Sequence, residues 1–252
     1  MTAEQLQRVY MRFSREVYIL STLQSPRIVP LYACASTTED LTLVMQYMRR
    51  GSLNRVLCSE NAWREVTPEM RHRLLCDVAQ GMQYLHDRNV YHRDLKSHNV
   101  LLTDDWRAVL TDFGMSKTCS AITAATHAKS TYAGGTLAWT APEVFKPRVG
   151  GGHRSNFTFK SDVYSYGIVV WEVLVADAAR AAPQARRWIQ QQMGELVAAV
   201  LRGDQPPLPA DSVSDANVAR AASHEALMRR CLAAEPEARP SFREAVAEQA
   251  AM

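Results

Sequence analysis

The sequence predicts an α+β protein, with short strands near the N-terminus and a mainly helical remainder. Two β-like runs, "RIVPLYACAS" at 27–36 and "LTLVMQYM" at 41–48, are joined by the turn-rich "TTED" at 37–40. After them, apolar residues recur mostly at helical spacing. With 252 residues, 47% of them apolar, the chain can bury a sizeable core as one domain or as two small lobes.

A helix is expected over residues 4–23, ahead of the first β-like run. Its apolar residues recur at helical spacing and comprise Val9, Phe13, Val17 and Leu20. Pro26 follows and ends the pattern, because proline cannot continue a helix. We therefore expect an amphipathic helix that carries Glu16.

The apolar spacing in the remainder of the sequence predicts several helices and one hairpin. A helix should begin at Thr67, with Pro68 at its first position and a buried stripe of Met70, Leu74, Val78, Met82 and Leu85. Two apolar runs around "DDW" predict a hairpin over 99–112, and the Ser-, Thr-, Ala- and Gly-rich segment 115–136 predicts a long loop. Further helices are expected at 161–175, at 188–201 and from about 215 to the end, interrupted at 235–242.

Composition argues against several function classes. The formal charge of +3 is small and the basic residues are scattered, so we expect no nucleic-acid partner and no membrane surface. Five cysteines, at 34, 58, 76, 119 and 231, are too far apart for a disulfide framework or a zinc site and favour a reducing, cytoplasmic compartment. The first residues do not resemble a signal peptide, and the apolar run 166–179 is shorter than the ~20 residues that cross a bilayer.

Four polar residues have the spacing that phosphoryl transfer requires. Asp94, Lys96 and Asn99 precede one apolar run, and Asp112 follows the next, directly before Phe113-Gly114. The reaction needs a carboxylate to orient the attacking hydroxyl, a cation near the moving phosphoryl group, and oxygen ligands for Mg²⁺. Taken singly, Asp112 could be a turn residue before a glycine, and Asp94 could be a loop acid that caps a backbone amide.

Five motifs in order resemble a eukaryotic protein kinase: "HRDLKSHN" (92–99), "DFG" (112–114), "GTLAWTAPEV" (135–144), "KSDVYSYGIVVWEVL" (160–174) and "CLAAEPEARPSF" (231–242). The residues of these motifs are similar to those of the tyrosine-kinase-like group of serine/threonine kinases, which includes mixed-lineage and Raf-type enzymes. The resemblance implies a bilobal kinase fold, with a partial small lobe at 1–48 (one helix and two strands) and a helical large lobe at 49–252. Its implied ligands are ATP, Mg²⁺ and a protein substrate, while the oligomeric state stays open.

The resemblance also assigns roles to residues at the site. Asp94 would be the catalytic base, Lys96 would contact the γ-phosphate, and Asn99 and Asp112 would hold Mg²⁺. Arg93 would bind a phosphate on the loop after "DFG". The residues implied to contact the adenine are the gatekeeper Met45, the hinge residues Gln46, Tyr47 and Met48, and Leu101 beneath the ring.

Other residues would have structural roles in such a kinase. Glu143 would form a buried ion pair with Arg239. A packed column between the lobes would be formed or anchored by His92, Phe113, Leu20, Leu31 and Asp162. Lys96 and the Gly135-Thr136 pair resemble serine/threonine kinases, and Thr136 would contact Asp94 and Lys96. Thr140 stands where the group commonly has Met, so the substrate-facing surface departs from the family pattern.

The resemblance is incomplete at the N-terminus. Kinases of this family place ATP under a Gly-rich loop and pair a strand lysine with a helix glutamate, here Glu16. The fifteen residues before Glu16 contain neither Gly nor Lys. We expect a fragment of an active serine/threonine kinase whose two-stranded small lobe is only marginally stable. The alternatives are a pseudokinase-like interaction module and, third, a tyrosine kinase.

The resemblance further predicts regulation by phosphorylation of the loop 115–136. A phosphate near Ser130, Thr131 or Thr136 could pair with Arg93 and order the loop. Ser120, Thr123 and Thr126 are further candidates, although a Ser- and Thr-rich loop can also be merely solvated.

Overall fold

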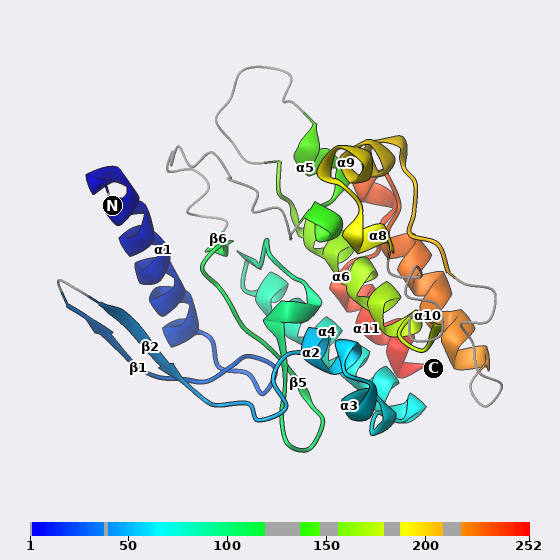
Figure 1. The fold of residues 1–252 in the computed structure, drawn as a ribbon, viewed down its shortest axis with the longest axis horizontal. Helices are drawn as coiled ribbons and strands as arrows, with labels where there is room; N and C mark the ends of the chain where they lie inside the picture. The colour runs from blue at the N-terminus through cyan, green and yellow to red at the C-terminus, as the bar shows by residue number, and fades with distance from the viewer. Residues whose placement is uncertain (1, 38–39, 119–136, 147–155, 179–186, 209–217) are drawn as a thin grey trace.

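The computed structural model describes residues 2–37, 40–118, 137–146, 156–178, 187–208 and 218–252. The α+β prediction is confirmed: Figure 1 shows helix α1 (Ala3–Thr22) and a two-stranded hairpin on one side, and the larger helical part on the other. In the described part of the chain, no helix is both long and apolar enough to cross a membrane.

Helix α1 begins with a capping box and ends where the sequence predicts. The Thr2 side chain accepts a hydrogen bond from the Gln5 amide at 3.2 Å, and the Gln5 side chain accepts one from the Thr2 amide at 2.8 Å. Its C-terminal half is buried at Ile19 and Leu20. Val9, which we expected on the apolar stripe, is 45% exposed, because the described residues bury only the C-terminal half of this helix.

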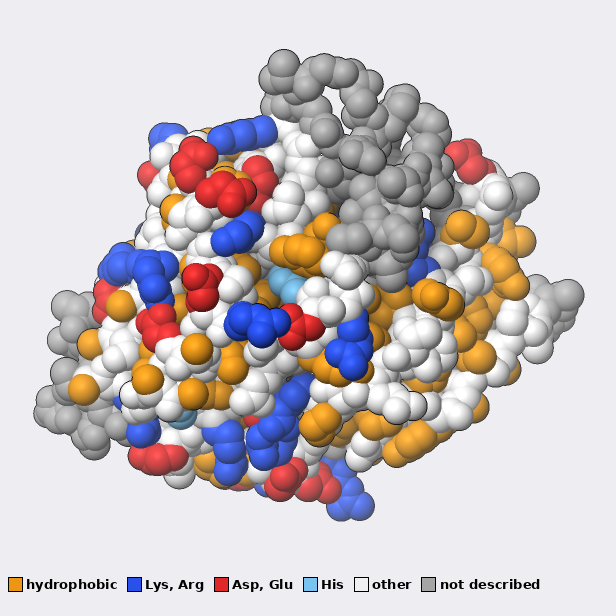
Figure 2. Space-filling view, turned by 180° about the vertical axis from the view of Figure 1, so that it is seen from behind, with side chains coloured by type: hydrophobic (Ala, Val, Ile, Leu, Met, Phe, Trp, Pro, Cys, Tyr) orange, Lys and Arg blue, Asp and Glu red, His pale blue; other side chains and the backbone are white. Residues whose placement is uncertain are grey.

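The strands after α1 form an antiparallel hairpin. Strand β1 (Leu31–Ser36) pairs with β2 (Leu41–Met45), with Ser36 opposite Leu41 and an irregularity between Leu31 and Ala33. Five of the six β1 residues are exposed. Figure 2 shows hydrophobic side chains gathered on the side where α1 and this hairpin lie. Tyr18 of α1 and Tyr32 of β1 are both largely exposed.

Two short helices that the sequence analysis did not predict follow the hairpin. Helix α2 (Leu53–Cys58) is capped by Ser52 and α3 (Glu60–Arg64) by Ser59, whose hydroxyls accept from the amides of Arg55 and Ala62. The predicted helix then appears as α4 (Pro68–Asp87), with Thr67 as its cap. Of its predicted stripe, Leu74, Val78, Met82 and Leu85 are buried and Met70 is partly buried.

Two pairs of short strands, two 3₁₀ turns and one short helix build the region that carries the polar motifs. Strand β3 (Val90–Tyr91) pairs with β6 (Lys117–Thr118), and the predicted hairpin is β4 (Val100–Leu102) with β5 (Ala108–Leu110). The 3₁₀ turn η1 (Ser97–Asn99) precedes β4. The 3₁₀ turn η3 (Leu137–Trp139) is followed by the short helix α5 (Pro142–Phe145). Most of the predicted loop 115–136 lies outside the described residues.

The larger part is organised around helix α6 (Phe159–Leu174), which is buried on nearly every side. Helices α10 (Val218–Cys231) and α11 (Phe242–Ala250), separated by the 3₁₀ turn η6 (Pro236–Ala238), match the predicted C-terminal helical region with its interruption. The helix expected at 188–201 is instead two helices, α8 (Arg187–Gln190) and α9 (Met193–Arg202). Its polar "QQQ" at 190–192 contains the break between them, so that prediction was wrong.

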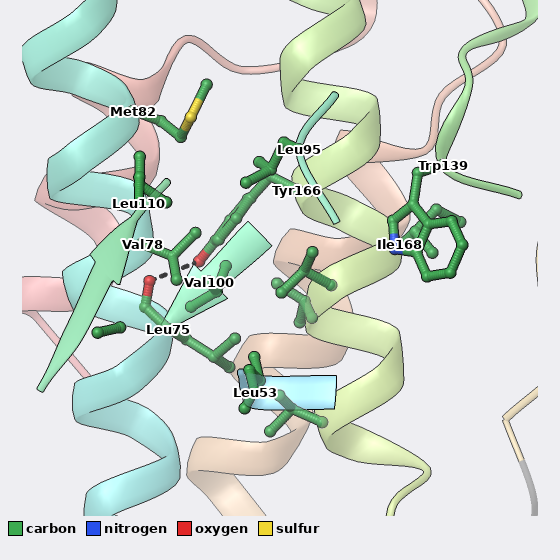
Figure 3. Packing of buried hydrophobic residues seen from close by; sticks show 14 of the residues in the cluster. Leu53, Leu75, Val78, Met82, Leu95, Val100, Leu110, Trp139, Tyr166 and Ile168 are labelled. Carbon is green, nitrogen blue, oxygen red and sulfur yellow. Dashed lines mark hydrogen bonds between the residues drawn. The ribbon is translucent and has the colours of Figure 1, made fainter. Parts of the chain in front are cut away.

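Close packing of α6 depends on a glycine and on a buried hydroxyl. A Cβ at Gly167 would lie 2.8 Å from a Leu232 methyl and 2.9 Å from the Cys231 Cβ, so only glycine allows α10 to approach this closely. The Tyr166 hydroxyl donates to the Leu75 carbonyl of α4 at 3.1 Å, as the dashed line in Figure 3 shows. The core thus joins α4, α6 and α10 behind the polar motifs.

Candidate active site

The polar loop between β3 and η1 is held by a buried carboxylate on α6. Asp162, 1% exposed, accepts hydrogen bonds from the backbone amides of His92 (2.9 Å) and Arg93 (2.8 Å) and from the His86 ring (2.9 Å). Burial alone would raise the pKa of Asp162, but the His86 hydrogen bond and the nearby positive charge outweigh it and lower the pKa. Arg93 adopts a left-handed backbone (φ 69°), and Asp162 stabilises this strained turn.

Asp94, Lys96 and Asn99 form one compact cluster. The Lys96 Nζ donates to Asp94 Oδ2 at 2.8 Å, and the Asn99 Nδ2 donates to the same oxygen at 3.0 Å and to the Asp94 carbonyl at 2.8 Å. The side chains of Asp94 and Lys96 are 12% and 18% exposed, so solvent reaches this pair from one side. The structure therefore brings together three of the four residues that the spacing predicted.

Asp112 lies at the same end of the β4–β5 hairpin as this cluster. The hairpin pairs Val100 with Leu110, and the Thr111 amide donates to the Asn99 carbonyl at 3.0 Å. Asp112 follows directly, in a left-handed conformation (φ 62°). The hairpin pairing therefore brings the Asn99 backbone next to Thr111, the residue before Asp112. Asn99 and Asp112 are nevertheless thirteen positions apart in the sequence.

Glu16 of α1 also reaches this region. A Cβ at Gly114 would lie 3.5 Å from Asp112 Oδ1 and 3.5 Å from Glu16 Oε2. Burial raises the pKa of Glu16, and the like charge of Asp112 raises it further, while a hydrogen bond from the Phe113 backbone opposes both. The helix and the "DFG" segment are therefore in direct contact.

The residues predicted to form the column between the two parts are packed in the core. His92 and Phe113 are both 0% exposed, and their ring centroids are 5.3 Å apart. Leu20 is buried as well, and Leu31 is partly buried against the same cluster. His92 and Phe113 are thus in ring contact, and Phe113 belongs to the same apolar core as Leu20.

The predicted adenine-contacting residues lie where β2 ends and α2 begins. The Gln46 amide donates to the Pro30 carbonyl at 3.1 Å, and the Gly51 amide donates to the Met48 carbonyl at 3.0 Å. Tyr47 is 80% exposed, whereas Met48 is buried. The remaining two, Met45 at the end of β2 and Leu101 on β4, are partly buried against the core.

The predicted ion pair between Glu143 and Arg239 is confirmed. Two guanidinium nitrogens of Arg239 donate to the two Glu143 oxygens, each at 2.8 Å. The Arg93 guanidinium donates to the Met115 carbonyl at 3.4 Å and stacks 4.5 Å above the Phe157 ring. Thr136 and the five other proposed phosphorylation sites (Ser120, Thr123, Thr126, Ser130 and Thr131) lie outside the described residues.

The donor chemistry of the site is compatible with Mg²⁺. Magnesium is usually held by one or two carboxylates together with water and substrate phosphates, and not by a dedicated cage of side chains. Asn99 directs its amide nitrogen to Asp94, so its Oδ1 is the atom that could meet a cation beside the Asp112 carboxylate. Within the described ranges, no group of three or more His, Cys, Asp or Glu side chains could itself hold a metal ion.

Two residues near the site were not identified from the sequence. His86 bonds to Asp162 at 2.9 Å, and Glu172 accepts from Ser97 and Trp139. A glutamate inside the apolar helix "YGIVVWEVLV" was a detectable signal, because a buried charge needs hydrogen-bond partners. The sequence did not show which partners it would have.

Comparison with known proteins identifies the family. Residues 1–248 match the family model for protein tyrosine and serine/threonine kinases. The chain is 35% identical over 232 residues to a probable serine/threonine-protein kinase, drkD, of Dictyostelium discoideum, covering 91% of this chain and 16% of that protein. It is 35% identical over 236 residues to the serine/threonine/tyrosine-protein kinase HT1 of Arabidopsis thaliana, covering 94% and 53%. It is 34% identical over 193 residues to the human serine/threonine-protein kinase TNNI3K, covering 72% and 22%.

The chain thus spans about half or less of the length of these relatives. The match nevertheless covers almost every residue from the first helix to the last, including the Asp94 cluster and Asp112. The chain therefore belongs to the protein tyrosine and serine/threonine kinase family.

Proposed function

We propose that the protein containing this chain is a serine/threonine kinase that transfers the γ-phosphate of ATP to a hydroxyl of a protein substrate. One observation carries the proposal: the Asp94 carboxylate is held by Lys96 and Asn99 at the end of the hairpin from which Asp112 emerges. Such a constellation supplies the parts that phosphoryl transfer needs. The serine/threonine preference is supported by the names of the relatives and by Lys96 in the "HRDLKSHN" motif.

Each residue of the cluster has a distinct proposed role. Asp94 would orient the substrate hydroxyl and accept its proton, since its carboxylate pairs with Lys96 and is partly open to solvent. Lys96 would hold the γ-phosphate next to that hydroxyl, and its present bond to Asp94 fixes the ammonium at that place. Asn99 and Asp112 would hold Mg²⁺, which when bound neutralises charge on the phosphates.

The rest of the proposal concerns nucleotide binding and organisation. The adenine would lie against Met45, Gln46, Tyr47, Met48 and Leu101, at the junction of a small lobe (1–48) and a large lobe (49–252). The 80% exposure of Tyr47 supports this, because a ligand can approach this segment from solvent. The free cysteines among the described residues support a reducing, cytoplasmic location.

A second candidate is an interaction module without efficient catalysis. One observation favours it: Glu16 faces the like charge of Asp112. In this alternative the fold would present its large lobe to protein partners.

The deciding experiment is phosphate transfer by the full natural protein. With γ-labelled ATP, Mg²⁺ and a peptide library, the proposal predicts labelled serine or threonine, and Asp94→Asn should reduce transfer by about a hundredfold or more. Asp204→Asn is the matched control and should change nothing, because the Asp204 side chain is exposed and pairs with its exposed neighbour Arg202. Absence of transfer, no thermal shift with Mg-ATP and an unaltered biological effect of Asp94→Asn would establish the second candidate. Labelled tyrosine would favour a tyrosine kinase.

A further inference from the structure

The carboxylate of Glu172 joins two segments of the candidate active site. Glu172 lies on α6 and is 1% exposed. Its Oε1 accepts a hydrogen bond from the Ser97 hydroxyl at 2.6 Å, and its Oε2 accepts one from the Trp139 indole at 2.9 Å. Ser97 and Trp139 are buried as well, so both hydrogen bonds are shielded from water. Because the two oxygens belong to one rigid group, their separation fixes the separation of the two donors.

The first of these segments is the turn η1, which carries the proposed catalytic side chains. Ser97 directly follows Lys96 and precedes Asn99 by two positions, and both of those residues bond to Asp94. The Asn99 amide also donates to the Lys96 carbonyl at 2.9 Å, which keeps the turn tight. Any displacement of Ser97 would therefore move the groups that position the Asp94 carboxylate.

The second segment is the turn η3, which precedes Thr140 and the "APE" motif. Its conformation is fixed by the Thr140 amide, which donates to the Leu137 carbonyl at 3.0 Å. It is also tied to α6, because the Ser165 hydroxyl donates to the Trp139 carbonyl at 2.7 Å. The His98 ring of η1 meets the Trp139 ring edge-on, with centroids 5.9 Å apart. The two turns are therefore neighbours, and Glu172 lies behind both.

We propose that Glu172 is a positioning residue for phosphoryl transfer, which holds the catalytic turn η1 at a fixed distance from the turn η3. This inference rests on the proposed kinase function. Hydrogen bonds in a buried site of low dielectric constant are stronger than the same bonds in water. A displacement of about 1 Å between reacting groups can cost about a hundredfold in rate, so a fixed frame behind Asp94 has a direct catalytic consequence.

Three variants separate this role from general stability. Ser97→Ala removes one donor, and Glu172→Leu removes both acceptors at similar volume. Glu172→Gln keeps an oxygen for the Trp139 indole, which can only donate, and offers an amide nitrogen to the Ser97 hydroxyl, which can also accept. The glutamine variant should therefore preserve the frame.

The matched control is Tyr166→Phe on the same helix. It removes the buried hydrogen bond to Leu75, and Figure 3 shows Tyr166 pointing toward α4 while Trp139 lies on the other side of α6. In the full natural protein, Ser97→Ala and Glu172→Leu should lower kcat at least about tenfold with KM for ATP within about twofold. Glu172→Gln should stay within about threefold of the unmodified protein, and Tyr166→Phe should lower Tm without changing kcat. Unchanged kcat in Ser97→Ala and Glu172→Leu, or an equal loss of kcat in Tyr166→Phe, would overturn the proposal.

A second readout does not depend on activity. The backbone amides of Asn99 and Thr140 are hydrogen-bonded within the two turns, so their hydrogen exchange reports on each turn separately. Ser97→Ala should accelerate exchange at Thr140 as well as at Asn99, whereas Tyr166→Phe should affect neither. If the unmodified protein transfers no phosphate, the kinase function fails while this measurement still tests the frame. Unchanged exchange at Thr140 in Ser97→Ala would reject the coupling.

Discussion

Arg239 and Glu143 are 96 positions apart in sequence, yet both oxygens of the carboxylate accept hydrogen bonds from the guanidinium at 2.8 Å. The Arg239 side chain is fully buried, and its remaining donors bond to the carbonyls of Ala233, Ala234 and Lys160. This pair ties the segment after η3 to the segment between α10 and α11. It therefore fixes helix α5 to the C-terminal part of the core.

Replacement of Arg239 should strongly destabilise the large lobe. Arg239→Leu would leave the Glu143 carboxylate without its buried cation, and breaking a buried pair costs about 3–5 kcal/mol. Urea unfolding should show this loss, and Glu143→Leu combined with Arg239→Leu should recover part of it. Arg202→Ala, which removes an exposed pair with Asp204, is the control and should cost below about 1 kcal/mol. A loss for Arg239→Leu as small as that of the control would contradict the structural role.

A buried histidine pair should make folding stability depend on pH. The His72 Nδ1 and His224 Nε2 atoms are 3.0 Å apart, so one ring nitrogen donates to the other and the accepting nitrogen carries no proton. Burial, followed by the charges of His72 and Arg220, lowers the pKa of His224 to about 4, and burial and Arg220 also lower the pKa of His72. Cys76 contacts His72 and has a raised pKa of about 11, so it stays uncharged in this range.

The sign of this effect follows from the lowered pKa values. An unfolded histidine has a pKa near 6.5, so below that pH the unfolded chain binds protons that the folded pair resists. The stabilisation is complete above about pH 6.5 and decreases as the pH falls toward 4, by roughly 1–2 kcal/mol between pH 7 and pH 5. Urea midpoints across this range measure it. His224→Leu should flatten the dependence. Equal slopes in His224→Leu and in the unmodified protein would exclude the pair as its source.

The cluster around Asp94 could be predicted from the sequence because its members are local. Asp94, Lys96 and Asn99 lie within six positions, and a short hairpin of apolar runs brings Asp112 to them. The Glu143–Arg239 pair was predicted only through the resemblance, since no local rule joins residues so far apart. Glu172 was missed for the same reason, because its partners Ser97 and Trp139 come from two distant segments.

The prediction of secondary structure from the sequence failed where the elements were short. Helices α2 and α3 have six and five residues, too few for an apolar period to emerge, and only their cap residues Ser52 and Ser59 could have indicated them. The expected helix at 188–201 contains the polar "QQQ" at 190–192. Helix α8 ends there at Gln190, and helix α9 begins at Met193. The exposure of Val9 shows that a helical period predicts a face but not whether another element covers it.

The β1–β2 hairpin should exchange amide hydrogens faster than the core of the large lobe. It is a two-stranded sheet whose first strand is largely exposed, and such ribbons are marginal without further strands or a covering helix. Hydrogen exchange of the isolated chain should show weak protection for amides 31–45 and strong protection for those of α6, whose residues are almost all buried. Protection of the hairpin equal to that of α6 would show that the small lobe is stable in this form.

The contact between Glu16 and Asp112 should be destabilising at neutral pH. Burial and the Asp112 charge raise the pKa of Glu16, so the folded chain holds this proton more tightly than the unfolded chain does. The stabilisation from the protonated form is complete below the unfolded pKa and is lost as the pH rises through the raised folded pKa. At pH 7 the ionised Glu16 is therefore unfavourable in the folded state.

Glu16→Gln should consequently stabilise the chain at pH 7, because the amide keeps an oxygen for the Phe113 backbone and carries no charge. The advantage should shrink as the pH falls toward 4, where Glu16 itself becomes protonated. Thermal unfolding of the isolated chain at both pH values provides the test, with Glu195→Gln at an exposed position of α9 as the control. A stabilisation that is independent of pH, or one shared by Glu195→Gln, would show that repulsion from Asp112 is not its cause.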